Sequence, residues 1–263
     1  MTELLAPAKI NLALVVGPTR PDGRHEVATV LQRVSLADRI ALEPATELRV
    51  EGFAEDTIVG RALEELAAAA DTAPNWHVTI DKQIPVAAGL GGGSSDAAAA
   101  LRLANWTLRR PLNDSALREL AARLGADVPF FLTTGPQLGE GDGTELSPLD
   151  LPQDYWILLL LPQGERKRST GAVYDAFTEE EGFGERRAAL LRALALGDLA
   201  ALPRNDLASS PVADDLRGHG AFRADVSGAG PAVYGLFAEQ EEALAAHAAL
   251  ERRGRAWLAA PGW

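Results

Sequence analysis

The stretch that decides the fold is IPVAAGLGGGSSD, residues 84–96. Four of the five residues in 89–93 are glycines, which permit positive φ angles and let a backbone approach another group closely. The alternating run 76–80 before this stretch predicts a strand, and the alanine-rich run 97–108 after it predicts a helix. A strand, a glycine loop and a helix N-terminus predict an anion site, because free backbone N–H groups and the positive end of the helix dipole meet there.

Ser94, Ser95 and Asp96 are predicted to cap this helix. The residue order excludes two common phosphate-binding motifs. No lysine follows the glycines as in G-x-x-x-x-G-K-[ST], and there is no G-x-G-x-x-G with a downstream acid. Backbone and hydroxyl groups would therefore hold a phosphate, and any lysine would come from elsewhere in the chain. A flexible linker or a tight strand-to-helix turn remains the alternative.

Composition limits the class of protein. The chain has 263 residues, 47% of them hydrophobic and 24% charged, which suits one large or two modest globular domains. The longest apolar run, 155–161, is too short to span a bilayer and predicts a buried strand. The absence of cysteine excludes disulfides and thiolate metal sites, and with no signal-like opening segment a cytoplasmic location is expected.

The net charge of −12 argues against nucleic acid or an anionic membrane as the main partner. A nucleotide ligand stays possible, because a phosphate site needs only local positive potential. The one tight basic cluster, Arg166-Lys167-Arg168, is typical of a solvated loop.

Three side chains outside the glycine loop are candidates for chemistry. Residues 3–17 predict a strand in which alternation places Lys9 and Asn11 on one face, either towards water or lining a polar cleft. A helix begins after Asn113 and ends at Gly125, and Pro129 predicts an extended residue before it, so that Asp127 lies at a corner. Asp127 is either a plain turn residue or an acid that faces a lysine such as Lys9.

The second half predicts a small α+β unit. A region rich in Gly, Pro, Asp and Glu, 135–154, predicts a domain boundary near its end. Strands near 155–161, 222–227, 232–237 and 255–258, with helices between them, predict an antiparallel, ferredoxin-like arrangement. The small residues 227–231 form either a tight hairpin or a place where a backbone approaches a ligand.

The order of these motifs strongly resembles the GHMP small-molecule kinases, and most of all those members that act on a cytidine diphosphate-linked alcohol in isoprenoid synthesis. The matching segments are PAKIN at 7–11, DGRHE at 22–26, the 85–96 loop, GADVPF at 125–130 and SGAGP at 227–231. The resemblance implies an α+β fold of two domains. Residues 1–154 would be similar to the second domain of ribosomal protein S5, residues 155–263 would be ferredoxin-like, and the active site would lie between them.

The resemblance also implies roles for individual residues, with ATP and Mg²⁺ as the cofactors. Lys9 and Asp127 would be catalytic, Asp127 as the general base. The residues implied around the ATP triphosphate form one loop: Pro85, Val86, Ala87, Ala88, Gly89, Leu90, Gly91, Gly92, Gly93, Ser94 and Ser95. Those implied around the cytidine diphosphate substrate are Asn11, His25 and Tyr174.

The chain departs from the family at Arg24, where the family usually carries a tyrosine that lies against cytosine. A guanidinium plane also stacks on a base, so Arg24 is expected to substitute for it. His25, taken alone, would be a surface residue of a turn.

Three alternatives remain at this stage. The chain could be a GHMP kinase for a homoserine or mevalonate-type acceptor, an S5-like RNA-binding module, or a nucleotide-binding regulator without catalysis. The sequence specifies neither the oligomeric state nor the metal ligands.

Overall fold

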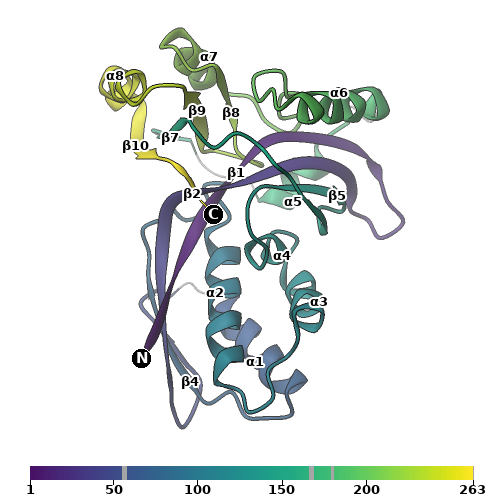
Figure 1. The fold of residues 1–263 in the computed structure, drawn as a ribbon, viewed down its shortest axis with the longest axis vertical. Coiled ribbons are helices and arrows are strands. Elements are labelled where there is room, and N and C mark those ends of the chain that lie inside the picture. Colours follow the sequence, from purple (N-terminus) through teal and green to yellow (C-terminus); the bar gives the residue numbers. More distant parts are fainter. Residues whose placement is uncertain (55–57, 166–168, 179–180, 263) are drawn as a thin grey trace. The chain divides into compact units, whose positions relative to one another are not determined.

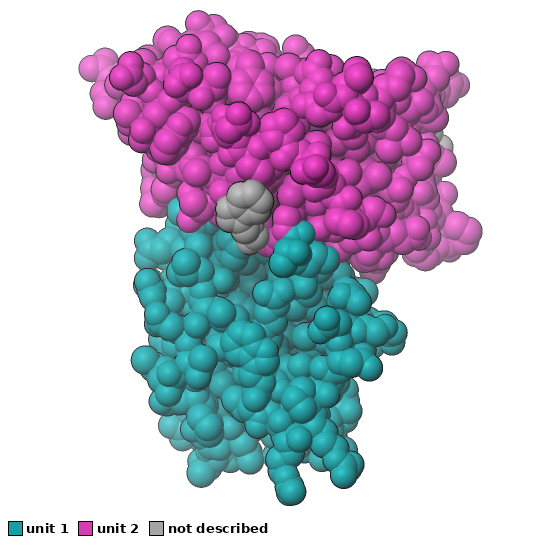
Figure 2. Space-filling view, viewed as in Figure 1, with its two compact units in different colours: residues 1–8, 36–86, 91–134 teal, residues 9–35, 87–90, 135–263 magenta. Residues whose placement is uncertain are grey.

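The computed structural model describes residues 1–54, 58–165, 169–178 and 181–262, so the Arg166–Arg168 cluster lies outside the described residues. The chain forms two compact units, coloured separately in Figure 2. Unit 1 contains residues 1–8, 36–86 and 91–134, and unit 2 contains residues 9–35, 87–90 and 135–263. The units interleave along the sequence, and two long strands contribute residues to both of them.

These two strands open the chain and pair with each other. They are β1 (Thr2–Thr19) and β2 (His25–Pro44). The prediction of a strand over 3–17 is confirmed, and the strand continues through Pro7. Residues 27–42, predicted as strand, lie within the uninterrupted β2.

Unit 1 combines the second half of β2 with two shorter strands and four helices. The strands are β3 (Arg49–Glu51) and β4 (Trp76–Asp81), and the helices are α1 (Val59–Ala69), α2 (Gly92–Thr107), α3 (Asp114–Leu124) and α4 (Val128–Phe131). β4 pairs antiparallel with β2 and parallel with β3. Helix α2 packs against α1 and β4 (Figure 1). Its alanines at 97–100 are buried, and small side chains of this kind let neighbouring elements approach closely.

Unit 2 holds the first half of β2 and the C-terminal part of the chain. Its further elements are β5 (Gln137–Gly141), β6 (Glu145–Pro148), β7 (Trp156–Pro162), α5 (Thr170–Asp175), α6 (Phe183–Leu196), α7 (Pro211–Gly218), β8 (Arg223–Val226), β9 (Val233–Phe237), α8 (Gln240–Leu250), the 3₁₀ helix η1 (Glu251–Arg253), β10 (Gly254–Ala259) and β11 (Pro261–Gly262). β5 pairs with β2 and β6, and the two residues of β11 pair antiparallel with β2.

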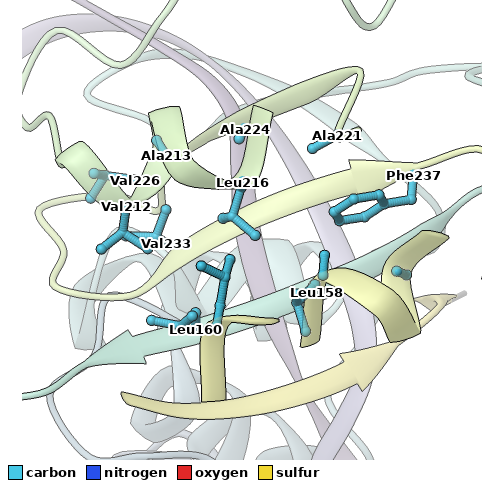
Figure 3. Close-up of a cluster of buried hydrophobic side chains, with 13 residues drawn as sticks. Leu158, Leu160, Val212, Ala213, Leu216, Ala221, Ala224, Val226, Val233 and Phe237 are labelled. Atoms are coloured by element: carbon cyan, nitrogen blue, oxygen red, sulfur yellow. The ribbon is translucent and has the colours of Figure 1, made fainter. Parts of the chain in front are cut away.

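The C-terminal sheet of unit 2 is antiparallel, with the strand order β10-β7-β9-β8. This confirms the antiparallel sheet predicted from the second half of the sequence. Figure 3 shows the buried side chains of this region gathered between its strands and the helices α7 and α8. Leu216 of α7 and Phe237 of β9 are among them and are fully buried. Burial of such apolar surface holds the helices on the sheet, at about 25 cal/mol per Å².

Several elements differ from the sequence predictions. β5 and β6 form a hairpin where the composition of 135–154 indicated only a boundary region; its turn is Asp142-Gly143, with Gly143 at φ 96°. Helix α7 and strand β11 were not predicted, although Ser210 caps α7 by accepting a hydrogen bond from the Val212 N–H. The proposed domain boundary at residue 154 stays a prediction.

Candidate functional site

A buried polar chain crosses β1 and β2 inside unit 2. Lys9 Nζ donates to Asn11 Oδ1 at 2.6 Å, and Asn11 Nδ2 donates to Thr29 Oγ1 at 2.8 Å. Thr29 in turn donates to the Ala13 carbonyl, so the orientation of the Asn11 amide is fixed. Lys9 and Asn11 are only 4% and 5% exposed. The reading in which they face bulk water is therefore wrong, because both faces of β1 are covered here.

Within unit 2, carbonyl groups of the glycine loop accept hydrogen bonds from β1 and from residues 227–232. Three successive carbonyls, of Ala88, Gly89 and Leu90, accept hydrogen bonds. The donors are the Ala232 N–H, the Ser227 hydroxyl and the Lys9 N–H, each at 2.9 Å. Because the acceptors of this segment are occupied by the protein itself, its N–H groups are the polar groups left to address a ligand.

Backbone conformation in the loop explains why glycine is needed there. Ala87, Gly89 and Gly91 have φ of 58°, 82° and 70°. A Cβ on Gly89 would lie 2.4 Å from the Ser227 carbonyl oxygen, a contact that real Cβ atoms do not make. Glycine is therefore required at position 89 for two reasons: the left-handed conformation and the close approach of two backbone segments.

The hairpin 227–231 joins β8 to β9 and lies close to Lys9 and Asn11 of β1. The Ser227 N–H donates to the Ala232 carbonyl, which makes the tight hairpin that the sequence left open. It also brings Gly228 beside β1: a Cβ on Gly228 would lie 3.3 Å from Asn11 Oδ1 and 3.6 Å from Lys9 Nζ. The tight hairpin is therefore confirmed, and the approach of this backbone to a ligand stays a prediction.

The start of α2 differs from the prediction. The helix begins at Gly92 with Gly91 as its N-cap, and no side chain caps it. Ser94, Ser95 and Asp96, predicted as caps, lie inside the first turns instead, because Gly91 provides the left-handed entry. The first N–H groups of a helix have no intrahelical partner, and together with the dipole they attract an anion.

A buried charge cluster in unit 1 holds the segment that precedes the loop. Asp38 is completely buried and accepts hydrogen bonds from Lys82 Nζ and from the N–H groups of Gln83 (2.5 Å) and Ile84 (2.8 Å). Lys82 Nζ also donates to Asp96 Oδ2 at 2.7 Å. Sequence reasoning missed this cluster, although it asked for a lysine from outside the glycine run.

Two polar side-chain atoms in the first turns of α2, one of them on Asp96 of this cluster, are buried without a hydrogen-bond partner among the described residues. They are Ser95 Oγ and Asp96 Oδ1. Burial raises the pKa of the Asp96 carboxyl to about 7, and repulsion from Asp38 adds to the rise while Lys82 opposes it. The described residues contain no group of three or more His, Asp or Glu side chains that could hold a metal ion.

Asp127 lies in unit 1 at the N-cap position of α4 and is half-buried. The prediction of an extended Val128 is wrong, because Val128 is the first helical residue. Pro129 falls in the first turn of the helix, where a missing N–H costs nothing. The helix α3 ends at Leu124 as predicted, and Gly125 follows with an extended φ of 172°.

His25 and Tyr174 come together in unit 2. The ring centroids are 5.8 Å apart, and Phe177, which the sequence analysis did not single out, lies 5.9 Å from His25 edge-on. Tyr174 and Phe177 pack against a buried cluster that contains Leu14. His25 Nδ1 lies 2.9 Å from the Gly17 carbonyl, which only accepts, so Nδ1 is the donor in this contact.

Arg24 extends elsewhere. Its side chain is 54% exposed and forms an ion pair with Asp142 in the β5–β6 turn. The guanidinium group is therefore engaged at the surface, next in sequence to His25.

Comparisons with known proteins agree with this geometry. The family model of the GHMP kinases N terminal domain matches residues 57–135, and the model of the GHMP kinases C terminal domain matches residues 187–256. The 4-diphosphocytidyl-2-C-methyl-D-erythritol kinase of Syntrophus aciditrophicus is 36% identical over 97% of this chain and 96% of its own length. The kinase of the same name from Symbiobacterium thermophilum is 38% identical over 91% of this chain and 92% of its own length.

Solved structures lead to the same family. A crystal structure of 4-(cytidine 5'-diphospho)-2C-methyl-D-erythritol kinase is similar to this chain with a TM-score of 0.83 and 34% identity, over 100% of both chains. The predicted two-domain α+β fold, S5-like at the N-terminus and ferredoxin-like at the C-terminus, is thereby confirmed. With family models that match both halves and relatives that match nearly its whole length, this chain belongs to the GHMP kinase family.

Proposed function

We propose that this protein transfers the γ-phosphate of ATP to the 2-hydroxyl of 4-(cytidine 5'-diphospho)-2-C-methyl-D-erythritol, a step of the non-mevalonate route to isopentenyl diphosphate. The observation that carries the proposal is full-length similarity, at 34–38% identity, to proteins that bear the name of this kinase. A glycine loop alone would fit any GHMP kinase. The additional motifs at 7–11, 125–130 and 227–231 support this particular assignment.

The glycine loop, residues 85–95, is proposed to hold the triphosphate. Its support is physical: carbonyls 88–90 are occupied by protein donors, and the N–H groups at the start of α2 have no intrahelical partner. Phosphoryl transfer demands alignment and charge stabilisation more than covalent chemistry from the protein. Backbone donors fixed in advance stabilise charge as it spreads over the transferring group.

Lys9 and Asp127 are proposed as the catalytic side chains. Asp127 takes the proton of the acceptor hydroxyl, a role that typically contributes about 10²–10⁴-fold. Lys9 supplies a positive charge that stabilises the negative charge developing on the attacking oxygen. Its ammonium is held in place by Asn11, which Thr29 orients.

The substrate side of the site is proposed to use Asn11, Arg24, His25 and Tyr174. The neighbouring rings of His25 and Tyr174, tilted by 36° with centroids 5.8 Å apart, offer flat surface for a base. Arg24, with its guanidinium at the surface beside Asp142, is the proposed substitute for the family's tyrosine.

Mg²⁺ is proposed as the cofactor. Magnesium in kinases is bound largely by phosphates and one or two protein oxygens, and the buried Ser95 Oγ, which lacks a hydrogen-bond partner among the described residues, is an oxygen of that kind. When bound, the ion neutralises phosphate charge.

The test is a panel of acceptor alcohols, each incubated with the purified protein, ATP and Mg²⁺. It contains the cytidylated methylerythritol, the same alcohol without cytidine, homoserine and mevalonate. ADP release and ³¹P NMR of the product report the reaction and its position. We expect phosphate on the 2-hydroxyl of the cytidylated alcohol alone; transfer only to one of the other acceptors would reverse the assignment in favour of another GHMP kinase activity.

A further inference from the structure

The hairpin 227–231 is hydrogen-bonded to Asn205, a residue to which the proposed reaction assigns no role. The side-chain amide of Asn205 donates two hydrogen bonds to this turn, to the Val226 carbonyl at 2.9 Å and to the Gly228 carbonyl at 2.7 Å. Its amide oxygen accepts from the Leu207 N–H at 2.8 Å. Asn205 is buried, and with these bonds its amide has little freedom to rotate.

Asn205 is itself anchored by a buried charged network. Its N–H donates to Asp225 Oδ2 at 2.9 Å, and the other carboxylate oxygen of Asp225 accepts from the Val226 N–H. Arg223 lies 3.7 Å from that carboxylate and donates to the carbonyls of Leu202 and Pro203. Buried polar groups connected in this way fix one geometry, because each broken bond leaves an unsatisfied group.

The same network reaches β1 beside the candidate catalytic residues. Arg223 Nε donates to the Tyr234 hydroxyl, and that hydroxyl donates to the Leu12 carbonyl at 3.0 Å. Burial raises the pKa of Tyr234 to about 12, so the phenol keeps its proton at neutral pH and remains a donor. Asn205 thus holds one side of a turn whose other side, at Gly228, faces β1: a Cβ added at Gly228 would lie 3.3 Å from Asn11 Oδ1 and 3.6 Å from Lys9 Nζ, so no side chain fits between them without close contact.

We propose that Asn205 is a positioning residue for phosphoryl transfer, which fixes the Gly228 peptide against Lys9 and Asn11. The inference rests on the proposed function of Lys9. Asn205 lies behind the turn and acts through it, by preventing the Gly228 peptide from moving relative to the Lys9–Asn11 pair. Its contribution should therefore fall on turnover more than on ATP binding, because the Ala88 and Leu90 carbonyls of the glycine loop accept from the N–H groups of Ala232 and Lys9, outside residues 227–231.

The test compares Asn205→Asp with Asp206→Asn. The first variant keeps size and the acceptor for Leu207 but removes both donors to the hairpin. The second removes a charge from the neighbouring residue, whose carboxylate accepts hydrogen bonds from the Val16 N–H and from Arg186, in β1 and α6, and not from the hairpin. We expect Asn205→Asp to lower kcat about tenfold or more, as loss of two hydrogen bonds implies, with the KM for ATP within about threefold. Asp206→Asn should lower Tm while kcat stays within about twofold.

Asn205→Ser, which keeps one donor, covers the case in which the aspartate variant does not fold, and its kcat should be intermediate. An Asn205 variant with unchanged kcat overturns the proposal, and so does an Asp206→Asn variant that loses as much kcat at the same loss of Tm. Wild-type turnover on the acceptor panel tests the proposed function by itself. The ratio of variant to wild type, measured on whichever alcohol is accepted, tests the role of Asn205, so that the two failures are distinguishable.

Discussion

At the scale of single residues, burial distinguishes the functional polar groups from ordinary surface polar groups. Lys9, Asn11 and Thr29 are all nearly inaccessible and bonded in sequence. Burying an ammonium group costs free energy unless polar groups compensate its charge. A buried, hydrogen-bonded lysine such as Lys9 is therefore a candidate for a functional role. The residue types were visible in the sequence, but their burial was not.

Asp127 gives the sharpest prediction at this scale. Asp127→Asn keeps the size of the side chain and removes the base, so kcat should fall by at least about 10²-fold. Binding of a non-hydrolysable ATP analogue, measured by calorimetry, should change less than about threefold. The exposed Asp150 offers a matched control, since Asp150→Asn should leave both values unchanged. Full turnover in the Asp127 variant would remove it from the catalytic assignment.

Asp96 predicts a pH dependence of stability. Its folded pKa of about 7 lies above the ordinary 3.8, so between these values the folded chain keeps a proton that the unfolded chain releases. The free energy of unfolding therefore falls as pH rises through this window, by at most about 1.4 kcal/mol per pH unit, and the stabilisation is complete only below the lower value.

Urea unfolding at pH 5, 6 and 7 measures this slope. Asp96→Asn removes the titrating group and should give a flatter profile than the wild type. Asp81→Asn changes an exposed carboxylate of the neighbouring strand β4 and should keep the wild-type slope. Equal slopes in the wild type and the Asp96 variant would contradict the role of this carboxyl.

At the scale of elements, local signals predicted most of the structure. Strand β4, the helix from Asn113 to Leu124 and the strands of the C-terminal sheet were readable because periodicity and capping residues are local. Errors arose at two helix starts: Gly91, not a serine, is the N-cap of α2, and Pro129 lies in the first turn of α4 instead of preventing it. The hairpin β5–β6 is short and contains glycines, so its alternation is too weak to read.

The glycine loop makes a prediction that belongs to this scale. Gly89→Ala forces a left-handed alanine and a Cβ 2.4 Å from a backbone oxygen, so the free energy of unfolding should drop by more than the 1–2 kcal/mol or so of the conformation alone. Gly93→Ala is the matched change in the first turn of α2. Its Cβ would lie 3.6 Å from Ile58, an ordinary contact, and alanine favours helix by about 1 kcal/mol. Denaturant titration measures the free energy of unfolding of both variants. Equal losses of stability in the two variants would show that the close approach at Gly89 is relaxed in solution.

At the scale of the whole molecule, charge and composition restrict the partners. The chain carries a net charge of −12, and none of its described helices is both long and apolar enough to cross a membrane. An S5-like fold invites comparison with RNA-binding proteins, whose affinity depends on neutralising phosphates with Lys and Arg.

We therefore expect no shift of single-stranded or duplex RNA in a native gel at about 0.1 M salt, a concentration at which RNA-binding modules retain their complexes. ATP with Mg²⁺ in the same preparation should still support acceptor phosphorylation. A complex that forms and weakens as salt is raised would revive the RNA-binding alternative.

The sequence by itself determined the order of the motifs, the family they resemble, the local elements and the positions where glycine is required. These depend on neighbouring residues, because propensity, capping and φ angles are properties of short segments. Only the tertiary structure decided that Asp38 and Asp96 share Lys82, that three loop carbonyls are occupied by distant donors, and that Asn205 holds the Gly228 turn. Such contacts join residues far apart in the chain, and burial and hydrogen bonding at that range arise only once the elements have packed.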